Sequence, residues 1–270
     1  MIIGRFAPSP SGPLHLGSVV AAVGSWLAAR KNNGQWLLRI EDLDTPRTVI
    51  GSDKLIIHEL QRLGLNWDGD ILYQSTRNDA YHEALKTLQE QQLIFSCTCT
   101  RKQLKGHKVY PGYCKDTFIK KDKSALRVIT SDTEISFNDK REGLCIQNLA
   151  QEAGDFVVKR KDGLFAYQLA VVVDDAYQHI NQIVRGRDLL ESTARQIYLQ
   201  QKLNFTRPEY EHLPLVLDQN GLKLSKSDAA KPVSNEDPLK LIQFSLNFLG
   251  FHVTNRNTPE KLLQDAIEKS

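Results

Sequence analysis

The stretch IIGRFAPSPSGPLHLGSVVAAVGSWLAARKNNGQWLLRI, residues 2–40, decides the fold class. It begins as a short apolar strand, passes through a turn rich in proline, glycine and serine, and continues from Leu16 into a helix of small and apolar residues. The helix ends at an Asn-Asn-Gly turn, and a second apolar strand follows. A strand, a helix and a second strand in this order predict a parallel α/β sheet.

The same alternation returns later in the chain. Helical periodicity covers residues 47–65 and 77–94, and a strand followed by a helix covers 182–203, with Ser192 or Thr193 as the predicted helix cap. The region between them is mixed and basic. We therefore predict the first half of the α/β domain over 1–96, an inserted α+β segment over 97–155, the second half over 156–228 and a helical segment over 229–270.

The composition is ordinary for a globular protein, with 41% hydrophobic and 25% charged residues among 270. No apolar run approaches the roughly 20 residues of a membrane-spanning helix, and the N-terminus lacks the layout of a signal peptide. We expect a cytoplasmic protein with no membrane partner. The net charge is only +3, but cations crowd into residues 100–127, which form either a solvated face or a contact surface for RNA.

The turn before the first helix can bind an anion. Unpaired amides and the helix dipole attract phosphate to a helix N-terminus. Gly12 and Gly17 would let the backbone approach a phosphate group, and His15 can donate a hydrogen bond from the same place. The alternative is a stiff turn that carries a surface histidine.

A second candidate is KLSKSD, residues 223–228. Lys223 and Lys226 are mobile point charges suited to a polyphosphate. Taken alone, the segment could equally be a solvated loop.

Together, PLHLGS (13–18) and KLSKS (223–227) resemble the HIGH and KMSKS signatures of class I aminoacyl-tRNA synthetases, with Ser18 in place of the second motif histidine. The stretches RFAPSPSGPLHLGS, RIEDLDTPR, YQLAVVVDD and VRGRDLLESTARQ are similar, in this order, to glutamyl-tRNA synthetases. The resemblance implies a class I catalytic domain, which is a Rossmann-type parallel sheet, with a zinc-binding α+β insertion and a short helical C-terminal tail.

The resemblance also implies the site residues. ATP, with Mg²⁺ shared among its phosphate oxygens, would be held by Gly12, His15, Gly17, Lys223, Ser225 and Lys226, and the two catalytic residues would be His15 and Lys226. L-glutamate would be held by Arg5, Ser9, Glu41, Tyr167 and Arg185. This set suits the substrate, because arginines pair with carboxylates, a carboxylate holds an ammonium group and hydroxyls fix orientation.

Three cysteines form a candidate metal clip. Cys97, Cys99 and Cys114 would leave one tetrahedral position on Zn²⁺ for a fourth ligand. Chemistry alone favours His107, whereas the family pattern C-x-C followed by Y-x-x-x-C favours Tyr110, which we adopt. Such a zinc ion would be structural. Cys145 is expected to be a small core residue.

Two features resemble the truncated branch of this family, the glutamyl-queuosine tRNA(Asp) synthetases. The chain ends soon after KLSKS, where a glutamyl-tRNA synthetase continues into an anticodon-reading domain, and Val171 stands where full-length enzymes typically carry asparagine. This resemblance implies a monomer that activates glutamate without tRNA and transfers it to queuosine in the anticodon of tRNA(Asp). Residues 100–127 would then face the anticodon stem-loop.

Three alternatives remain open at this point. The chain could be a glutamyl-tRNA synthetase-like fragment with another acceptor, a paralogue that binds RNA without catalysis, or another nucleotidyltransferase that joins a small acid to an amine. The last class shares the nucleotide turn but lacks RIEDLD and VRGRDLLESTARQ.

Overall fold

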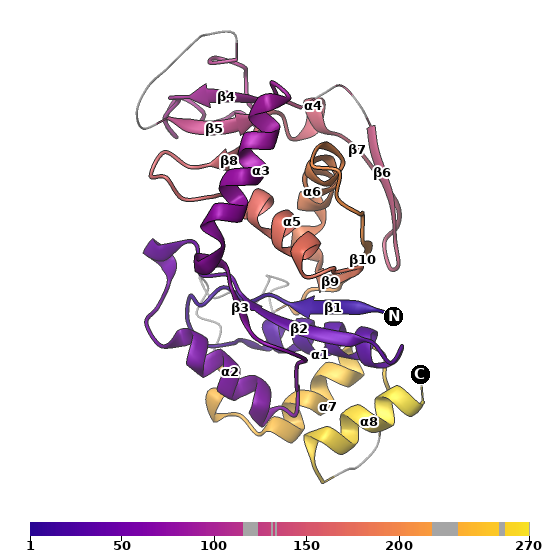
Figure 1. Cartoon of the computed structure of the whole chain (residues 1–270). Coiled ribbons are helices and arrows are strands. Elements are labelled where there is room, and N and C mark those ends of the chain that lie inside the picture. The colour runs from indigo at the N-terminus through magenta and orange to yellow at the C-terminus, as the bar shows by residue number, and fades with distance from the viewer. Residues whose placement is uncertain (116–123, 131, 133, 218–231, 254–256, 270) are drawn as a thin grey trace. The chain divides into compact units, whose positions relative to one another are not determined.

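The computed structural model describes residues 1–115, 124–130, 132, 134–217, 232–253 and 257–269. The chain folds as two compact units (Figure 1). The first comprises Met1–Ser75, Ile180–Leu190 and Pro208–Ser270, and the second comprises Thr76–His179 and Glu191–Arg207.

The first unit is built on parallel strands. Strand β1 (Ile3–Phe6) pairs with β2 (Gln35–Ile40), which pairs with the short β3 (Leu72–Tyr73), and both pairings are parallel. Strand β9 (Gln182–Gly186) pairs in parallel with β10 (Glu209–Leu213). The backbone N–H of Asn181 donates to the Ile3 carbonyl at 3.1 Å, so β9 begins beside β1. The predicted parallel α/β architecture is confirmed.

Helix α1 (Leu16–Arg30) begins where the sequence predicts and packs closely on these strands. It is buried along most of its length because its small residues permit a close approach. At Gly24, an added Cβ would lie 2.5 Å from Cδ1 of Leu213. Helices α7 (Pro238–Phe248) and α8 (Pro259–Glu268) lie on the same side of β1 and β2 (Figure 1) and contribute to one apolar core with α1.

Helix α2 (Ser52–Arg62) is shorter than the predicted segment 47–65. A 3₁₀ turn over Thr45–Arg47 precedes it, and Gly51 adopts a left-handed conformation with φ of 79°. That conformation interrupts the backbone before Ser52, so the helix starts there.

The second unit combines helices with antiparallel strands. A sheet is formed by β4 (Ile94–Cys97), β5 (Ala125–Val128) and β8 (Phe156–Lys159), and β6 (Glu134–Asp139) forms a hairpin with β7 (Gly143–Asn148). Its helices are α3 (Asn78–Glu90), α4 (Leu149–Glu152), α5 (Tyr167–Tyr177) and α6 (Leu190–Lys202). Only the first residue of α6, Leu190, is assigned to the first unit. Asp174 on α5 is buried and accepts hydrogen bonds from Tyr81 at 2.6 Å and Arg77 at 3.2 Å, which ties α5 to α3 and the turn before it.

Two predictions about this region were wrong. Ser192 and Thr193 do not cap α6, because a 3₁₀ turn over Arg187–Leu189 leads directly into the helix at Leu190 and places both residues inside its first turn. Cys145 is not a core residue. It lies half-buried on β7, between the exposed side chains of Leu144 and Ile146.

Across the described part of the chain, no helix combines the length and the apolar character that crossing a membrane requires.

Candidate functional site

A hollow opens in the first unit at the carboxyl ends of β1, β9 and β10, which is where open parallel sheets bind their ligands. It is lined by the end of β1 and the following loop, the first turns of α1, and the segments after β9 and β10. The lining residues are Phe6, Pro8, Ser9, Ser11, Leu14, His15, Gly17, Ser18, Val20, Ala21, Gly186, Asp188, Leu213, Pro214, Leu215 and Val216. We call this space the helix-end hollow.

His15 lies at the N-terminus of α1 and lines the helix-end hollow. It is the N-cap residue, and its Nδ1 accepts a hydrogen bond from the Ser18 backbone N–H at 3.3 Å. Because Nδ1 is an acceptor, the neutral imidazole carries its proton on Nε2. The ring therefore presents an N–H donor in addition to the amides of the first helical turn.

Gly12 is held by a residue far along the chain. Gly17 lines the helix-end hollow, but Gly12 does not. Gly12 has a φ of 125°, a backbone conformation that favours glycine. The Ser52 hydroxyl accepts a hydrogen bond from the Gly12 N–H at 3.0 Å and donates one to the Gly12 carbonyl at 2.7 Å. Sequence reasoning missed Ser52, whose partner is 40 residues away.

A second hollow lies on the other side of the loop that follows β1. It is lined by Ser9, Pro10, Ser11, Glu41, Asp44, Arg47 and Thr48. Backbone hydrogen bonds from Glu41 to Pro8 at 3.0 Å and from Val49 to Pro10 at 2.8 Å fix this loop. Ser9 and Ser11 line both hollows, so one short loop is the wall between them.

Two of the predicted glutamate ligands, Arg5 and Arg185, share one face of the sheet. Phe6 and Val184, their neighbours along β1 and β9, belong to the core built around α1. Since side chains alternate along a strand, both arginines project from the opposite face, and both are buried. The carboxylate of Glu41 lies 3.5 Å from the Arg39 guanidinium.

Arg185 is oriented by a residue that sequence reasoning also missed. Its Nε donates to Nε2 of His212 at 3.1 Å, and His212 is completely buried on the neighbouring strand β10. The sequence shows only a histidine between a glutamate and a leucine in the short stretch EYEHL, which does not indicate its partner.

The remaining predicted residues of the ATP and glutamate sites are Tyr167, Lys223, Ser225 and Lys226. Tyr167 is the first residue of α5, in the second unit. Lys223, Ser225 and Lys226 lie outside the described residues.

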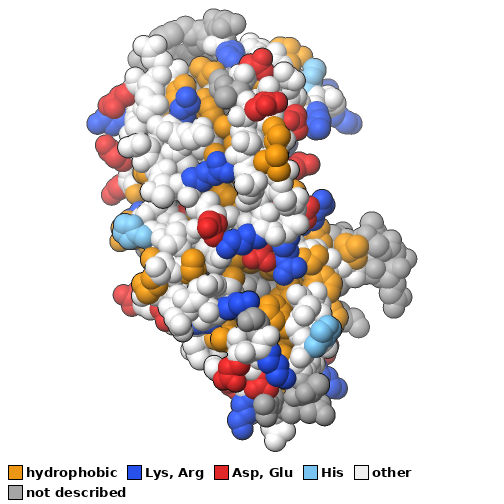
Figure 2. Space-filling view, turned by 90° about the vertical axis from the view of Figure 1, so that its right-hand side faces the viewer, with side chains coloured by type: hydrophobic (Ala, Val, Ile, Leu, Met, Phe, Trp, Pro, Cys, Tyr) orange, Lys and Arg blue, Asp and Glu red, His pale blue; other side chains and the backbone are white. Residues whose placement is uncertain are grey.

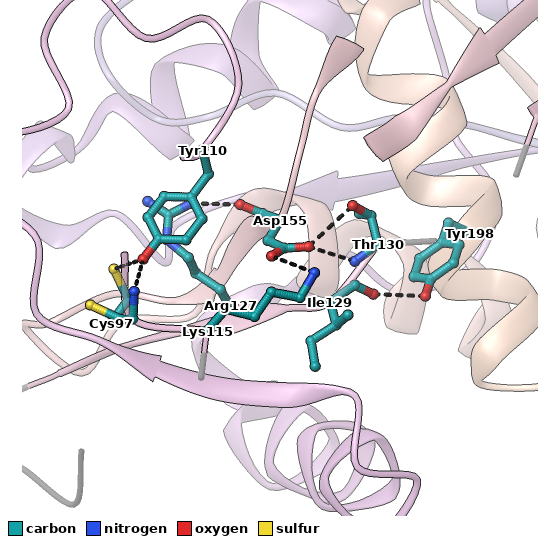
Figure 3. Close-up of polar contacts among 9 residues, drawn as sticks. Cys97, Tyr110, Lys115, Arg127, Ile129, Thr130, Asp155 and Tyr198 are labelled. Atoms are coloured by element: carbon teal, nitrogen blue, oxygen red, sulfur yellow. Dashed lines mark hydrogen bonds and ion pairs between the residues drawn. The ribbon is translucent and has the colours of Figure 1, made fainter. Parts of the chain in front are cut away.

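The second unit brings the predicted metal ligands together, and Figure 3 shows Cys97 beside Tyr110. The sulfurs of Cys97, Cys99 and Cys114 lie within 4.8 Å of one another. The Tyr110 hydroxyl is 3.5 Å from Sγ of Cys97 and 3.7 Å from Sγ of Cys99. His107 instead places its Nε2 3.3 Å from the Tyr113 hydroxyl. Three thiols and a phenol oxygen thus face a common point.

Negative charge in this cluster concentrates on Cys114. Burial opposes its ionisation, but hydrogen bonds from the Thr98 backbone and from Tyr110 and Cys99 outweigh burial and lower the pKa of Cys114 to about 6. Burial raises the pKa of Cys99 and of Tyr110. Thiolates are the soft ligands that Zn²⁺ prefers, so this donor set fits that ion.

Comparison with known proteins identifies the family of the chain. Residues 1–256 match the catalytic domain of the class I tRNA synthetases for E and Q, glutamate and glutamine. The chain belongs to this family. It is therefore an enzyme of the ligase type with a class I synthetase fold.

Several relatives within the class I synthetase family are similar over most of the chain. The glutamyl-Q tRNA(Asp) synthetase of Pseudomonas putida is 46% identical over 267 residues, covering 98% of this chain and 88% of the relative. That of Pseudomonas fluorescens is 49% identical over 249 residues, covering 92% and 84%.

Solved synthetase structures share the fold. A glutamate tRNA ligase from Elizabethkingia meningosepticum, crystallised with its amino acid, superposes with a TM-score of 0.74 at 29% identity, covering 84% of this chain and 52% of the ligase. The chain thus spans about half the length of that enzyme. A putative arginyl-tRNA synthetase from Campylobacter jejuni has a TM-score of 0.53 at 14% identity, which shows likeness of fold alone.

Proposed function

We propose that this chain activates L-glutamate with ATP in the absence of tRNA and transfers the glutamyl group to queuosine at the anticodon wobble position of tRNA(Asp). The names of relatives at 46–49% identity support the acceptor. One structural observation carries the activation step, which is the pair of hollows divided by the loop that contains Ser9 and Ser11.

In the proposed reaction, ATP occupies the helix-end hollow as its Mg²⁺ complex. An oxygen of the glutamate α-carboxylate attacks the α-phosphorus, the bond to the β-phosphate oxygen breaks, and glutamyl-adenylate and pyrophosphate form. No covalent bond to the enzyme is needed, so catalysis consists of positioning and of stabilising charge on the phosphate oxygens. The Nε2–H of His15 donates to those oxygens. We assign Lys226 to the same charge, with Lys223 and Ser225 on ATP.

The glutamate assignments follow the chemistry of the substrate. Arg5 and Arg185 pair with its two carboxylates, and their burial strengthens such pairs because little water screens them. Glu41 holds the ammonium group, and the hydroxyls of Ser9 and Tyr167 fix the orientation of the amino acid.

We also propose that Zn²⁺ binds Cys97, Cys99, Cys114 and Tyr110. Four protein ligands complete a tetrahedral site and leave no position for substrate, so the ion would stabilise the loop between β4 and β5. The proximity of the Tyr110 hydroxyl to two of the sulfurs supports tyrosine as the fourth ligand over His107.

The acceptor is tested with labelled glutamate, ATP and tRNA prepared with or without queuosine. We expect label only on the queuosine-containing tRNA, and we expect it to remain after the 3′-terminal nucleotides are removed. Label confined to the 3′ end would contradict the proposed acceptor.

Activation is tested separately by exchange of pyrophosphate into ATP without tRNA. We expect exchange that depends on glutamate. A paralogue that only binds RNA would show no exchange, and a nucleotidyltransferase of other specificity would respond to a different acid.

A further inference from the structure

The second unit contains a cationic pocket that the proposed activation chemistry does not use. The loop between Cys99 and Cys114, strands β5 and β8, and helix α6 enclose it. Its charged walls are Lys108, Arg127, Arg195 and Asp155, and its other walls are mainly apolar.

Arg195, on α6, is the most unusual of these residues. Its side chain is half-buried, and within the described part of the chain its guanidinium has no hydrogen bond or salt bridge, with Nε fully shielded from solvent. Burial lowers the pKa of Arg195, and only the Coulombic influence of Glu191, one turn earlier on α6, opposes this. A desolvated cation without an acceptor is costly, so this arrangement suits a ligand that brings negative charge.

Arg127 presents a second guanidinium to the same pocket. Its Nη1 donates to the Asp155 carbonyl at 2.6 Å, and its guanidinium carbon lies 4.0 Å from the centre of the Tyr110 ring, so its orientation is fixed (Figure 3). Its Nε is also buried, and no acceptor for it is found among the residues described.

Asp155 is the only acid among the described residues that line the pocket, and it does not neutralise these cations. One carboxylate oxygen of Asp155 accepts from the backbone and hydroxyl of Thr130 at 2.7 and 3.1 Å. The other lies 3.3 Å from Nζ of Lys115. With Asp155 and Lys115 paired, the two guanidiniums and the exposed Lys108 leave the pocket positive.

We propose that this pocket binds a phosphate group of the RNA backbone. The inference rests on the proposed function only in taking tRNA as the partner. Guanidinium forks match phosphate oxygens, and neutralising backbone phosphates contributes much of the affinity of proteins for nucleic acids. Exposed Arg101, Lys102 and Lys105 extend the positive charge from the pocket along the surface loop, as a polyanion requires. Arg127 already covers one face of the Tyr110 ring, and the pocket offers mainly positive charge, which favours a phosphate over a base.

The test is the variant Arg195→Gln. Its charge-matched control is Lys86→Gln, which removes an exposed cation on α3 of the same unit. We expect Arg195→Gln to weaken tRNA binding about tenfold and to reduce the slope of log Kd against log salt by about one. Lys86→Gln should leave both quantities unchanged. Glutamate-dependent pyrophosphate exchange should match wild type in both variants.

Arg195→Met is a second test of the pocket, for the case in which Arg195→Gln folds poorly. Because the guanidinium is buried without an acceptor, replacing it with an apolar side chain should maintain or raise the thermal midpoint while still weakening tRNA binding. Wild-type tRNA affinity and salt slope in a folded variant would overturn the proposal. A lowered midpoint together with reduced exchange would assign Arg195 a structural role and also overturn it.

The last experiment measures the thermal midpoint of wild type and of Arg195→Gln with and without inorganic phosphate. If phosphate stabilises wild type but not Arg195→Gln, and tRNA affinity is equal in the two proteins, the pocket takes a free anion and the RNA assignment is wrong. Failure of the proposed function is visible separately, because the nucleotide that receives glutamate is determined on the wild-type enzyme.

Discussion

His15 combines two tasks that substitutions can separate. It caps α1 through Nδ1, and it directs the other ring nitrogen to donate a hydrogen bond. Asparagine is a strong N-cap residue, but its amide is too short to replace the second function.

We therefore predict that His15→Asn lowers the rate of glutamate-dependent pyrophosphate exchange about 100-fold, the cost typical of losing one donor to developing charge. The thermal midpoint should stay near wild type. His15→Ala should lose the same activity and, in addition, about 1 kcal/mol of stability through loss of the cap. Wild-type exchange rates in His15→Asn would contradict the phosphate role.

His212 is a positioning residue for Arg185, with which it shares a buried hydrogen bond. We predict that His212→Leu raises KM for glutamate about tenfold, since about 1.4 kcal/mol corresponds to a factor of ten and a hydrogen bond to a charged group contributes 1.5–3 kcal/mol. The turnover number should change less.

The matched variant is His212→Gln, whose amide oxygen can still accept from Nε of Arg185. It should recover most of the affinity for glutamate. Equal impairment of the leucine and glutamine variants would indicate that His212 acts only by filling space.

These residues show what the sequence could and could not predict at the site. The position of His15 and Gly17 at the start of α1 was predictable because their motif lies in one short stretch, at a strand-to-helix junction that local composition indicates. His212 and Ser52 were not found, because their partners are set by strand register and loop packing across 27 and 40 residues.

At the scale of elements, the loop between β4 and β5 carries the cysteine cluster that we propose binds Zn²⁺. We predict that Tyr110→Phe releases Zn²⁺ to a chelator faster than wild type, because it removes the oxygen that faces the sulfurs. His107→Ala should release metal at the wild-type rate. Metal content and the time course of chelation check both variants, and the reverse order would make histidine the fourth ligand.

Gly24 on α1 lies against the side chain of Leu213 at the end of β10. A methyl group at Gly24 would collide with Leu213, which lines that hollow. Gly24→Ala should therefore lower the free energy of unfolding by about 1–3 kcal/mol and raise KM for ATP. Adding Leu213→Ala should restore part of the lost stability, measured by denaturant titration, and strictly additive losses would contradict the collision.

The elements themselves were partly predictable. The start of α1 was found because proline and glycine punctuate the chain before it. The starts of α2 and α6 were not, since a left-handed Gly51 and a 3₁₀ turn at 187–189 moved them relative to the hydrophobic pattern. The periodicity of apolar residues indicates which face of a helix is buried, but it does not locate the first residue of the helix.

At the scale of the molecule, the net charge is small. The net charge is +3, and cationic and anionic side chains are interspersed on the face shown in Figure 2. Binding of tRNA should therefore depend on local cations such as those around Arg195.

This arrangement predicts different salt responses for the two half-reactions. Raising the salt concentration from about 50 to about 200 mM should lower kcat/KM for tRNA by about tenfold or more, through competition of counterions for phosphate contacts. Pyrophosphate exchange should change by less than about twofold, because Arg5 and Arg185, the proposed partners of the glutamate carboxylates, are buried. A parallel decline of both activities in a salt series would contradict this division.

The loop that separates the two hollows has one further consequence. An occupant on either side restrains Ser9 and Ser11, so part of the ordering cost of the loop is met by whichever substrate arrives first. Thermodynamic linkage then requires reciprocity, in that the factor by which the nucleotide tightens amino-acid binding equals the factor by which the amino acid tightens nucleotide binding. The short loop that contains Ser9 and Ser11 would thus make each of the two small substrates increase the affinity of the enzyme for the other.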